Sequence, residues 1–312
     1  MSTADKVRQI DLSGCELIGR GQCADVYKTE EGHAVKIFFE TMPYESIIRE
    51  YEKTCLTKSF GIHSVSCFGL VSWQGKTGIE LELVKGTDLQ TAMLHDVENS
   101  RDYGRRMAEE MKLIHSKTPD KDLFPPIHEF YLDCVGKCLA DGWISQEEAG
   151  LVESCIRAIP VSDTMIHGDY HTRNIMVEDG ELKLIDLADC MSGNPVYDLM
   201  ITNLYLHFVP DYAPSLFDLF FKITREQLND CWDQFVRTYF DTCDEARINR
   251  INEILNVYSM LKLILAAHSF SNMKEEMLKG IVEMGRTYLM PNIRSYTGVI
   301  PEDIRLLGMQ EQ

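Results

Sequence analysis

The first forty residues alternate hydrophobic and polar positions with a period of two, which is typical of half-buried strands. Three such runs come early, separated by glycine turns, and two more follow a helical stretch at residues 44–58. The five runs cover residues 15–18, 25–29, 33–39, 66–73 and 78–84. Short turns between neighbouring runs favour antiparallel pairing. The pattern therefore predicts a five-stranded antiparallel sheet accompanied by one helix.

Beyond residue 85 the hydrophobic positions recur every three or four residues, as they do in amphipathic helices. Helices are predicted at residues 103–115, 127–140, 146–159, 197–208, 214–222, 225–239, 244–270 and 272–289. Residues 290–312 show no clear pattern and are expected to be irregular. The sequence thus predicts an α+β protein with a small β-rich lobe, residues 1–84, and a larger, mainly helical lobe, residues 85–312.

One segment inside the helical part has the pattern of a β-hairpin. Two short apolar runs, residues 175–177 and 182–185, flank an Asp-Gly turn, which is a strong hairpin signal. Such a hairpin brings Asn174, at its entry, and Asp186, at its exit, to the same end. The loop just before it contains His167 and Asp169.

An acid, an amide and a second acid in this order suit phosphoryl transfer. That reaction needs a base to orient a hydroxyl and oxygen ligands for the magnesium ion that binds the phosphates. Asp169 suits the first task, and Asn174 and Asp186 suit the second. The protein-kinase pattern H-R-D-x-x-x-x-N, followed by a metal-binding Asp, has the same step between its Asp and Asn. An ordinary hairpin with surface carboxylates is the alternative.

The same segment resembles the aminoglycoside phosphotransferase and choline kinase group of small-molecule kinases. The resemblance rests on H-G-D at residues 167–169, Asn174, I-D at residues 185–186, G-N-P at residues 193–195 and D-L at residues 198–199. Asn194 stands where that family usually has an acid. The resemblance implies a bilobal, protein-kinase-like fold with ATP in the cleft, a catalytic role for His167 and Asp169, and an Asp198 that braces the catalytic loop.

Two features of the small lobe extend this resemblance. A turn with Gly19 and Gly21 approximates the kinase glycine loop, with Ala24 at the third glycine, and glycines let backbone amides approach phosphates. Lys36 lies in an apolar strand where kinases place their phosphate-binding lysine. Glu50 follows in the next helix and is the expected ion-pair partner of Lys36.

Two other glutamates of that helix, Glu45 and Glu52, are expected on solvated faces, although Glu45 is the replacement candidate for the pair. By resemblance, backbone groups of the hinge around Glu82 and Val84 would contact the adenine edge.

Composition sets outer limits on function. The chain has 312 residues, 45% of them hydrophobic, which indicates a globular protein with a sizeable core. A net charge of −18 disfavours nucleic acid and anionic membranes as partners. Ten cysteines without C-x-x-C pairs, and an amino terminus without the apolar core of a signal peptide, predict reduced thiols and a cytoplasmic location.

These observations predict an enzyme that transfers the γ-phosphoryl group of Mg-ATP to a hydroxyl of a small molecule. An atypical protein kinase and a non-catalytic nucleotide-binding module are the alternatives. The acceptor is expected to be cationic if the acids of the late helices line a cleft; the same acids can instead be solvated helix surface. These acids are Asp211, Asp218, Glu226, Asp230, Asp233, Asp241, Asp244 and Glu245.

Overall fold

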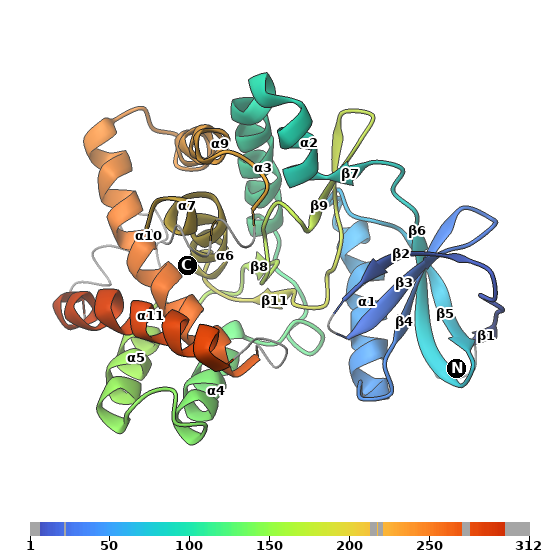
Figure 1. The fold of residues 1–312 in the computed structure, drawn as a ribbon, viewed down its shortest axis with the longest axis horizontal. Coiled ribbons are helices and arrows are strands. Elements are labelled where there is room, and N and C mark those ends of the chain that lie inside the picture. Colours follow the sequence, from blue (N-terminus) through green and yellow to red (C-terminus); the bar gives the residue numbers. More distant parts are fainter. Residues whose placement is uncertain (1–6, 22, 213–216, 218–220, 270–274, 297–312) are drawn as a thin grey trace. The chain divides into compact units, whose positions relative to one another are not determined.

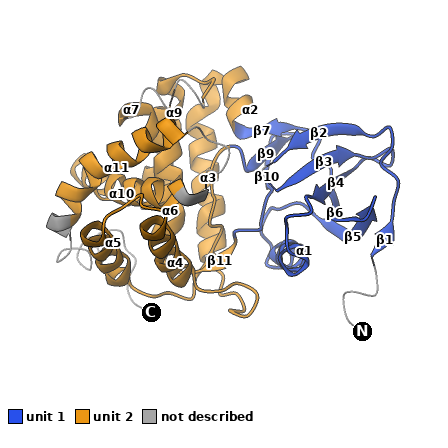
Figure 2. Ribbon diagram, turned by 60° about the horizontal axis from the view of Figure 1, so that its bottom comes forward, with its two compact units in different colours: residues 1–89, 173–189 blue, residues 90–172, 190–312 orange. Residues whose placement is uncertain are grey.

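The computed structural model describes residues 7–21, 23–212, 217, 221–269 and 275–296 (Figure 1). The chain divides into two compact units that are not continuous in sequence (Figure 2). The first unit comprises Met1–Leu89 and Arg173–Asp189, and the second comprises Gln90–Thr172 and Cys190–Gln312. The first unit thus extends past the predicted boundary at residue 84, and it also includes the hairpin segment that the sequence analysis placed in the helical lobe.

The main sheet of the first unit has six strands in the order β1-β5-β6-β4-β3-β2. Their bounds are β1 Arg8–Gln9, β2 Glu16–Arg20, β3 Ala24–Lys28, β4 His33–Phe38, β5 Cys67–Trp73 and β6 Lys76–Glu82. The predicted count of five was wrong because β1 adds a sixth strand, parallel to β5. The other neighbours pair antiparallel, as predicted.

Helix α1, Tyr44–Ser59, packs on one face of this sheet. Its Ile47 joins a buried cluster with Phe38, Leu70 and Ile79. Alternate positions of the same strands, including Val35 and Val71, form a second buried cluster. The sheet is therefore covered on both faces, which explains why β4 reads as an almost continuous apolar run interrupted by Lys36.

The predicted hairpin is present and forms a second sheet of this unit. Strands β9, Ile175–Glu178, and β10, Glu181–Leu184, pair antiparallel, and β7, Thr87–Asp88, pairs with β9 on its other side. The turn residues Asp179 and Gly180 have φ values of 52° and 82°. These left-handed conformations are what a two-residue turn between twisted strands requires, and Asp-Gly supplies them at low cost.

The second unit is mainly helical, as predicted. Its helices are α2 Leu89–His95, α3 Ser100–His115, α4 Ile127–Ala140, α5 Gln146–Ala158, α6 Val196–Asn203, α7 Val209–Tyr212, α9 Arg225–Tyr239, α10 Glu245–Leu265 and α11 Glu275–Tyr296. Short 3-10 turns span Val97–Asn99 and Ala266–Ser269, and a π-helical turn, η3, spans Leu204–Phe208. Strands β8, Met165–Ile166, and β11, Met191–Ser192, pair antiparallel beside the helices.

Local sequence signals explain where several of these helices begin. Ser145 and Thr224 each close a capping box at the start of α5 and α9, and the Asp244 side chain caps α10. Helices α3 and α9 approach so closely that a side chain at Gly104 would collide with the Cys231 carbonyl. This close contact requires glycine at that position.

Three helix predictions need correction or lie beyond the described residues. Residues 197–208 were expected as one helix, but the α-helix changes to the π-helical turn η3 at Leu204. Helix α11 continues through Pro291 to Tyr296, where an irregular segment was expected from residue 290. The helix predicted at residues 214–222 falls almost wholly outside the described residues. Among the described helices, none combines the length and apolarity that a membrane span needs.

Candidate active site

A lysine held by two carboxylates lies in the first unit. Lys36 Nζ is 2.7 Å from Glu50 Oε1 and 3.0 Å from Asp186 Oδ1. The Lys36 and Glu50 side chains are 17% and 9% exposed, whereas Asp186 is 50% exposed. The predicted ion pair between Lys36 and Glu50 is thus confirmed, and Glu45, its rival, is exposed.

The environment of this lysine fixes its charge. Burial by itself would lower the pKa of Lys36, but the charges of Asp186 and Glu50 and their hydrogen bonds outweigh it, so the pKa is raised. Burial raises the pKa of Glu50 against the opposing effect of Lys36. Lys36 faces two carboxylates and therefore stays protonated, whereas Glu50 shares one ammonium with Asp186.

Asp186 is held in an unusual backbone conformation at the exit of the hairpin. Its φ is 58°, in the left-handed region that non-glycine residues rarely occupy. The amide of Ile185 donates to the carbonyl of Asn174 at 3.0 Å, so Asn174 and Asp186 lie at the same end of the hairpin, as predicted. Strained conformations of this kind persist where the surrounding structure enforces them, often at functional sites.

The oxygen atoms of Asn174 and Asp186 are the hard ligands that magnesium prefers. Among the described residues, no group of three or more His, Cys, Asp or Glu side chains could hold a metal ion. The two oxygen donors Asn174 and Asp186 fit magnesium, which usually takes one or two protein oxygens and completes its coordination shell with phosphates and water.

The glycine turn and the hinge are both fixed by backbone bonds. The amide of Gly21 donates to the Ala24 carbonyl at 2.8 Å, which closes the turn after Gly19. The amide of Glu82 donates to the Ser66 carbonyl at 2.9 Å, so it is already engaged within the protein. On the far side of Val84, the amide of Lys85 donates to the Glu178 carboxylate at 2.6 Å.

The Glu82 side chain has a partner that the sequence analysis missed. Its carboxylate lies 2.6 Å from Lys183 Nζ and accepts from the Ser66 amide at 2.9 Å. Burial opposes the ionised form, but the bonds to Lys183 and Ser66 prevail and lower the pKa of Glu82 to about 2. This pair joins the hinge to the hairpin strand β10.

The H-G-D loop of the second unit, residues 167–169, is held by a fully buried acid. The Asp198 carboxylate accepts the amide of His167 at 2.8 Å and the amide of Gly168 at 2.7 Å. Gly168 has a φ of 82°, which explains a glycine where protein kinases have Arg. The expectation that Asp198 braces the loop is confirmed.

Two further residues support Asp198, and sequence reasoning missed their role. Nε2 of His115, the last residue of α3, is 3.1 Å from Asp198, and its Nδ1 is 2.7 Å from the Tyr239 hydroxyl. Burial, together with the charge of Asp198, raises the pKa of Tyr239, so its hydroxyl stays a donor.

Asp169 differs from Asp198 in its access to solvent, because its side chain is 33% exposed. Its Oδ2 lies 3.2 Å from His171 Nε2. Burial would raise the pKa of Asp169, but the hydrogen bond and charge of His171, with smaller effects of Lys262 and His167, lower it. Asp169 is therefore an ionised carboxylate that is partly accessible to solvent.

His167 is buried, with 1% of its surface exposed. Its Nδ1 accepts the amide of Asp169 at 3.3 Å, and its ring contacts Tyr170 edge-on. These contacts hold the His167 ring within the loop, and its predicted part in catalysis stays a prediction.

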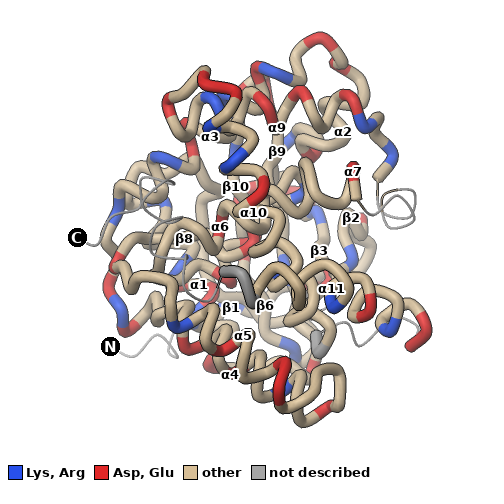
Figure 3. Tube along the Cα trace, turned by 90° about the vertical axis from the view of Figure 1, so that its left-hand side faces the viewer, with Lys and Arg blue, Asp and Glu red and all other residues tan. Residues whose placement is uncertain are grey.

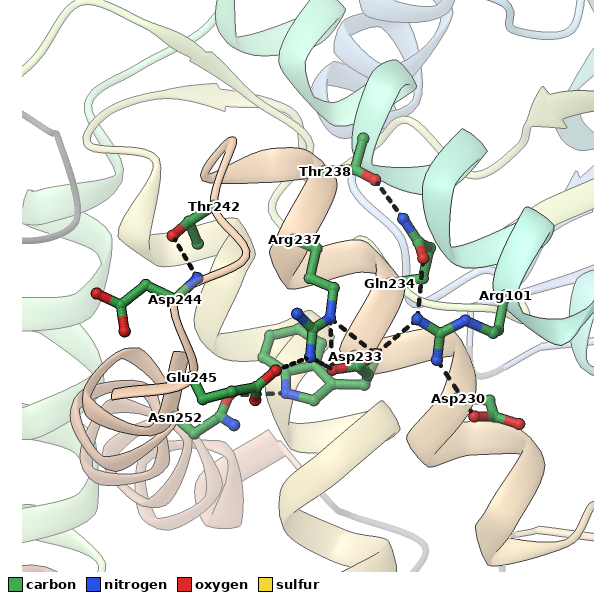
Figure 4. Close-up of polar contacts among 11 residues, drawn as sticks. Arg101, Asp230, Asp233, Gln234, Arg237, Thr238, Thr242, Asp244, Glu245 and Asn252 are labelled. Atoms are coloured by element: carbon green, nitrogen blue, oxygen red, sulfur yellow. Dashed lines mark hydrogen bonds and ion pairs between the residues drawn. The ribbon is translucent and has the colours of Figure 1, made fainter. Parts of the chain in front are cut away.

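Most of the acids considered for acceptor binding have partners within the second unit. Asp230 and Asp233 bind Arg101 of α3, and Asp233 and Glu245 bind Arg237 of α9 (Figure 4). Basic and acidic positions are interspersed around α3 and α9 (Figure 3).

Two other acids in this set also have local partners. Asp244 caps α10, and Asp211 lies 3.4 Å from His207. Asp218 lies outside the described residues. The described arrangement is that of helix surfaces linked by ion pairs.

Comparison with known proteins identifies the family. A model of the phosphotransferase enzyme family matches residues 14–230, which is more than half of the chain. No curated protein sequence matched. The chain belongs to the phosphotransferase enzyme family, which identifies it as a small-molecule phosphotransferase.

Solved structures share the fold at low sequence identity. The amicoumacin kinase hAmiN, in complex with AMP-PNP, Ca²⁺ and Ami, aligns with a TM-score of 0.61 and 13% identity over 93% of this chain and 91% of that one. The ADP-bound aminoglycoside phosphotransferase APH(2'')-Ib aligns at 0.57 and 16% over 87% and 92%. A choline/ethanolamine kinase family protein from Mesorhizobium loti aligns at 0.54 and 14% over 96% and 88%. These likenesses confirm the protein-kinase-like fold.

Proposed function

We propose that this protein is an ATP-dependent kinase that transfers the γ-phosphoryl group of Mg-ATP to a hydroxyl of a small molecule. The observation that carries the proposal is the Lys36 ammonium held at once by Glu50 and Asp186. A structural ion pair needs only one carboxylate. The second, half-exposed carboxylate on a strained backbone is suited to a magnesium ion, and the lysine to phosphate.

Each group then has a distinct task. Lys36, oriented by Glu50, binds the α- and β-phosphates. Asn174 and Asp186 hold magnesium, which supplies charge neutralisation at the transferring phosphoryl group when it is bound. The hinge around Glu82 and Val84 binds the adenine; because the Glu82 amide is engaged by Ser66, we assign that contact to the backbone of Val84.

Asp169 orients the acceptor hydroxyl and receives its proton. The acceptor oxygen forms a bond to the γ-phosphorus as the bond from that phosphorus to the ADP oxygen breaks, and the proton then passes from Asp169 to solvent. The pKa of Asp169 is lowered, so its carboxylate is ionised and able to accept throughout the neutral range.

The ion pairs of Asp233 with Arg101 and of Glu245 with Arg237 favour the alternative that these acids are solvated helix surface rather than the lining of a cleft for a cation. We therefore propose that the phosphate acceptor is a hydroxylated small molecule, with or without an amine. Similar structures include complexes with gentamicin and streptomycin and a choline/ethanolamine kinase family protein, so hydroxylated amines belong in the first screen.

The test is a screen for ADP formation with Mg-ATP and a panel of sugars, amino alcohols, nucleosides and aminoglycosides, with a generic phosphoacceptor protein included. We expect one class of small hydroxylated compounds to stimulate ADP formation and the protein to give none. Asp169→Asn should reduce turnover by about 100-fold or more while nucleotide binding is retained, as for loss of a general base. Phosphorylation of the protein acceptor alone would favour a protein kinase, and near-normal turnover in Asp169→Asn would reject the assigned base.

A further inference from the structure

Helix α6 and the π-helical turn η3 that follows it present one face to the catalytic loop. Three side chains on this face, Asp198, Thr202 and Tyr205, are spaced by four and then three residues, the spacing that places residues on one side of a helix. Thr202 Oγ1 donates to the Tyr170 carbonyl at 2.8 Å. The face therefore fixes the backbone of the loop at two points, through Asp198 and through Thr202.

The third member, Tyr205, fixes a side chain of the loop. Its ring stacks on the His171 ring with centroids 4.3 Å apart and an interplanar angle of 28°. On its other side Tyr205 contacts the buried Phe221 edge-on, at 6.1 Å. The π-helical turn begins at Leu204, so Tyr205 is carried by a non-standard turn, a feature often found at functional sites.

His171 connects this aromatic support to the proposed base. Its side chain is only 9% exposed, and its Nε2 lies 3.2 Å from Asp169 Oδ2. The ring is thus held by Tyr205 on its face and bonded to Asp169 at its edge. Neither the H-G-D pattern nor the Asn and Asp that follow it account for a buried histidine at this position.

We propose that His171 is a positioning residue that fixes the orientation of the Asp169 carboxylate, and that Tyr205 holds His171 in place for this purpose. The inference rests on the proposed function, since Asp169 acts as a base only if the protein transfers phosphate. The physical reason is that a bond to one carboxylate oxygen helps to fix the direction in which the other oxygen points. A displacement of about 1 Å in a reacting group can cost on the order of 100-fold in rate.

Other charged groups face Asp169 as well. Lys262 of α10 and His167 both act on its carboxylate electrostatically. Lys262 lies over the Tyr131 ring at 5.6 Å, and the His167 ring is directed at Tyr170. His171 acts on the Asp169 carboxylate through a side-chain hydrogen bond as well as through charge, so its removal should release one carboxylate oxygen in addition to changing the electrostatics.

The experiment compares two replacements of His171. Gln places a side-chain N–H near the position of the imidazole Nε2, whereas Leu removes the donor. We expect His171→Leu to lower kcat by about 10- to 100-fold, with the KM for ATP changed by less than about 2-fold, and His171→Gln to recover most of the loss. Should His171→Leu fail to fold, His171→Asn, whose amide is too short to reach, takes its place.

A matched control comes from the same π-helical turn. Nδ1 of His207 lies 3.4 Å from Asp211, and the His207 ring stacks on Trp232 with centroids 6.1 Å apart. His207→Leu removes a histidine-aspartate contact of similar length from η3, but one that does not involve the catalytic loop. Its turnover per folded molecule should equal that of the wild type.

A double variant shows whether His171 acts through Asp169. In the Asp169→Asn background, His171→Leu should lower the residual turnover by less than about 2-fold, because there is no base left to position. A further loss equal to that of the single variant would overturn the proposal, as would full activity in His171→Leu or an equal loss in His207→Leu. If the wild type transfers phosphate to no acceptor in the panel, the proposed function fails and this role with it. An active wild type with an equally active His171→Leu overturns only the positioning role.

Discussion

Two groups of ion pairs, one in each unit, show how differently charge is used in this protein. In the first unit Lys36 meets Glu50 and Asp186, and the Lys36 and Glu50 side chains are 17% and 9% exposed. In the second unit Arg101 and Arg237 meet Asp230, Asp233 and Glu245, where Arg101 is 48% and Glu245 69% exposed. Both groups contain more acids than bases, so their charge balance does not distinguish them.

Burial and backbone strain do distinguish them. Taking Lys36 and Glu50 out of water costs several kcal/mol for each ion before their attraction is counted. Asp186 adds a left-handed backbone conformation. The exposed group has neither cost, because its charges stay largely hydrated and connect the surfaces of α3 and α9. The density of acids along the sequence is therefore a poor guide to a site, and a costly arrangement of a few charges is a better one.

The strongest test of this difference removes one positive charge from each group. Lys36→Met should lower turnover by about 100-fold or more, since the variant loses the phosphate contact and leaves Glu50 buried without its partner. Arg101→Met makes the same chemical change in the exposed group and should leave turnover within about 2-fold of the wild type. Steady-state kinetics measures turnover for both variants. Equal losses of turnover would contradict the proposed difference between the two groups of ion pairs.

A second test changes one acid in each group. Asp186→Asn should weaken binding of Mg-ATP by about 10-fold, because the amide keeps an oxygen ligand but loses the negative charge that magnesium prefers. Binding of ATP without magnesium should not weaken, since a negative charge beside the phosphates has been removed. Calorimetric titration with and without magnesium separates these effects. Asp233→Asn serves as the control, and a loss of affinity that does not depend on magnesium would exclude the ligand role.

Much of the first group could be predicted because its signals are local. Lys36 interrupts an apolar strand, Glu50 lies on the following helix, and Asp-Gly fixes the hairpin that ends at Asp186. The structure confirms each placement, including the left-handed φ values of Asp179 and Gly180.

What the sequence did not reveal depends on contacts between distant residues or on very short elements. His115 and Tyr239 bond to each other although 124 positions separate them, and no periodic pattern relates the two. Strand β1 is two residues long, too short to show alternation. Helix α11 continues through Pro291, although proline usually ends a helix. The sequence also left open whether the acids of α9 lie on a solvated surface or line a cleft. The ion pairs of Asp233 with Arg101 and Arg237 favour the solvated surface, and they could not be read from the sequence.

The side chains of Glu82 and Lys183 are 28% and 19% exposed, so this pair lies between the two groups in burial. Neither residue is a proposed magnesium ligand, so the pair shows the effect of burial on stability alone. The pKa of Glu82 is lowered to about 2, so ionised Glu82 stabilises the fold above its unfolded pKa near 4.5, and this contribution is lost as the pH falls from 4.5 towards 2. Glu82→Gln should reduce the free energy of unfolding by about 1 kcal/mol at pH 7. Urea titrations at pH 7 and pH 4 should show the difference shrinking at the lower pH, whereas a constant difference would point to packing.

The smallest expected effect concerns the stability of the exposed group. Arg101 binds Asp230 at 3.4 Å, Asp233 at 2.8 Å and the Gln234 side chain at 3.0 Å, yet all these contacts lie near solvent. Arg101→Met should therefore lower the free energy of unfolding by less than about 1 kcal/mol, and 0.5 M salt should reduce the difference because exposed charges are screened. Urea titration at low and high salt measures both quantities. A loss above about 2 kcal/mol that salt does not change would place this group with the buried one, and the acids of α9 would again become candidates for an acceptor site.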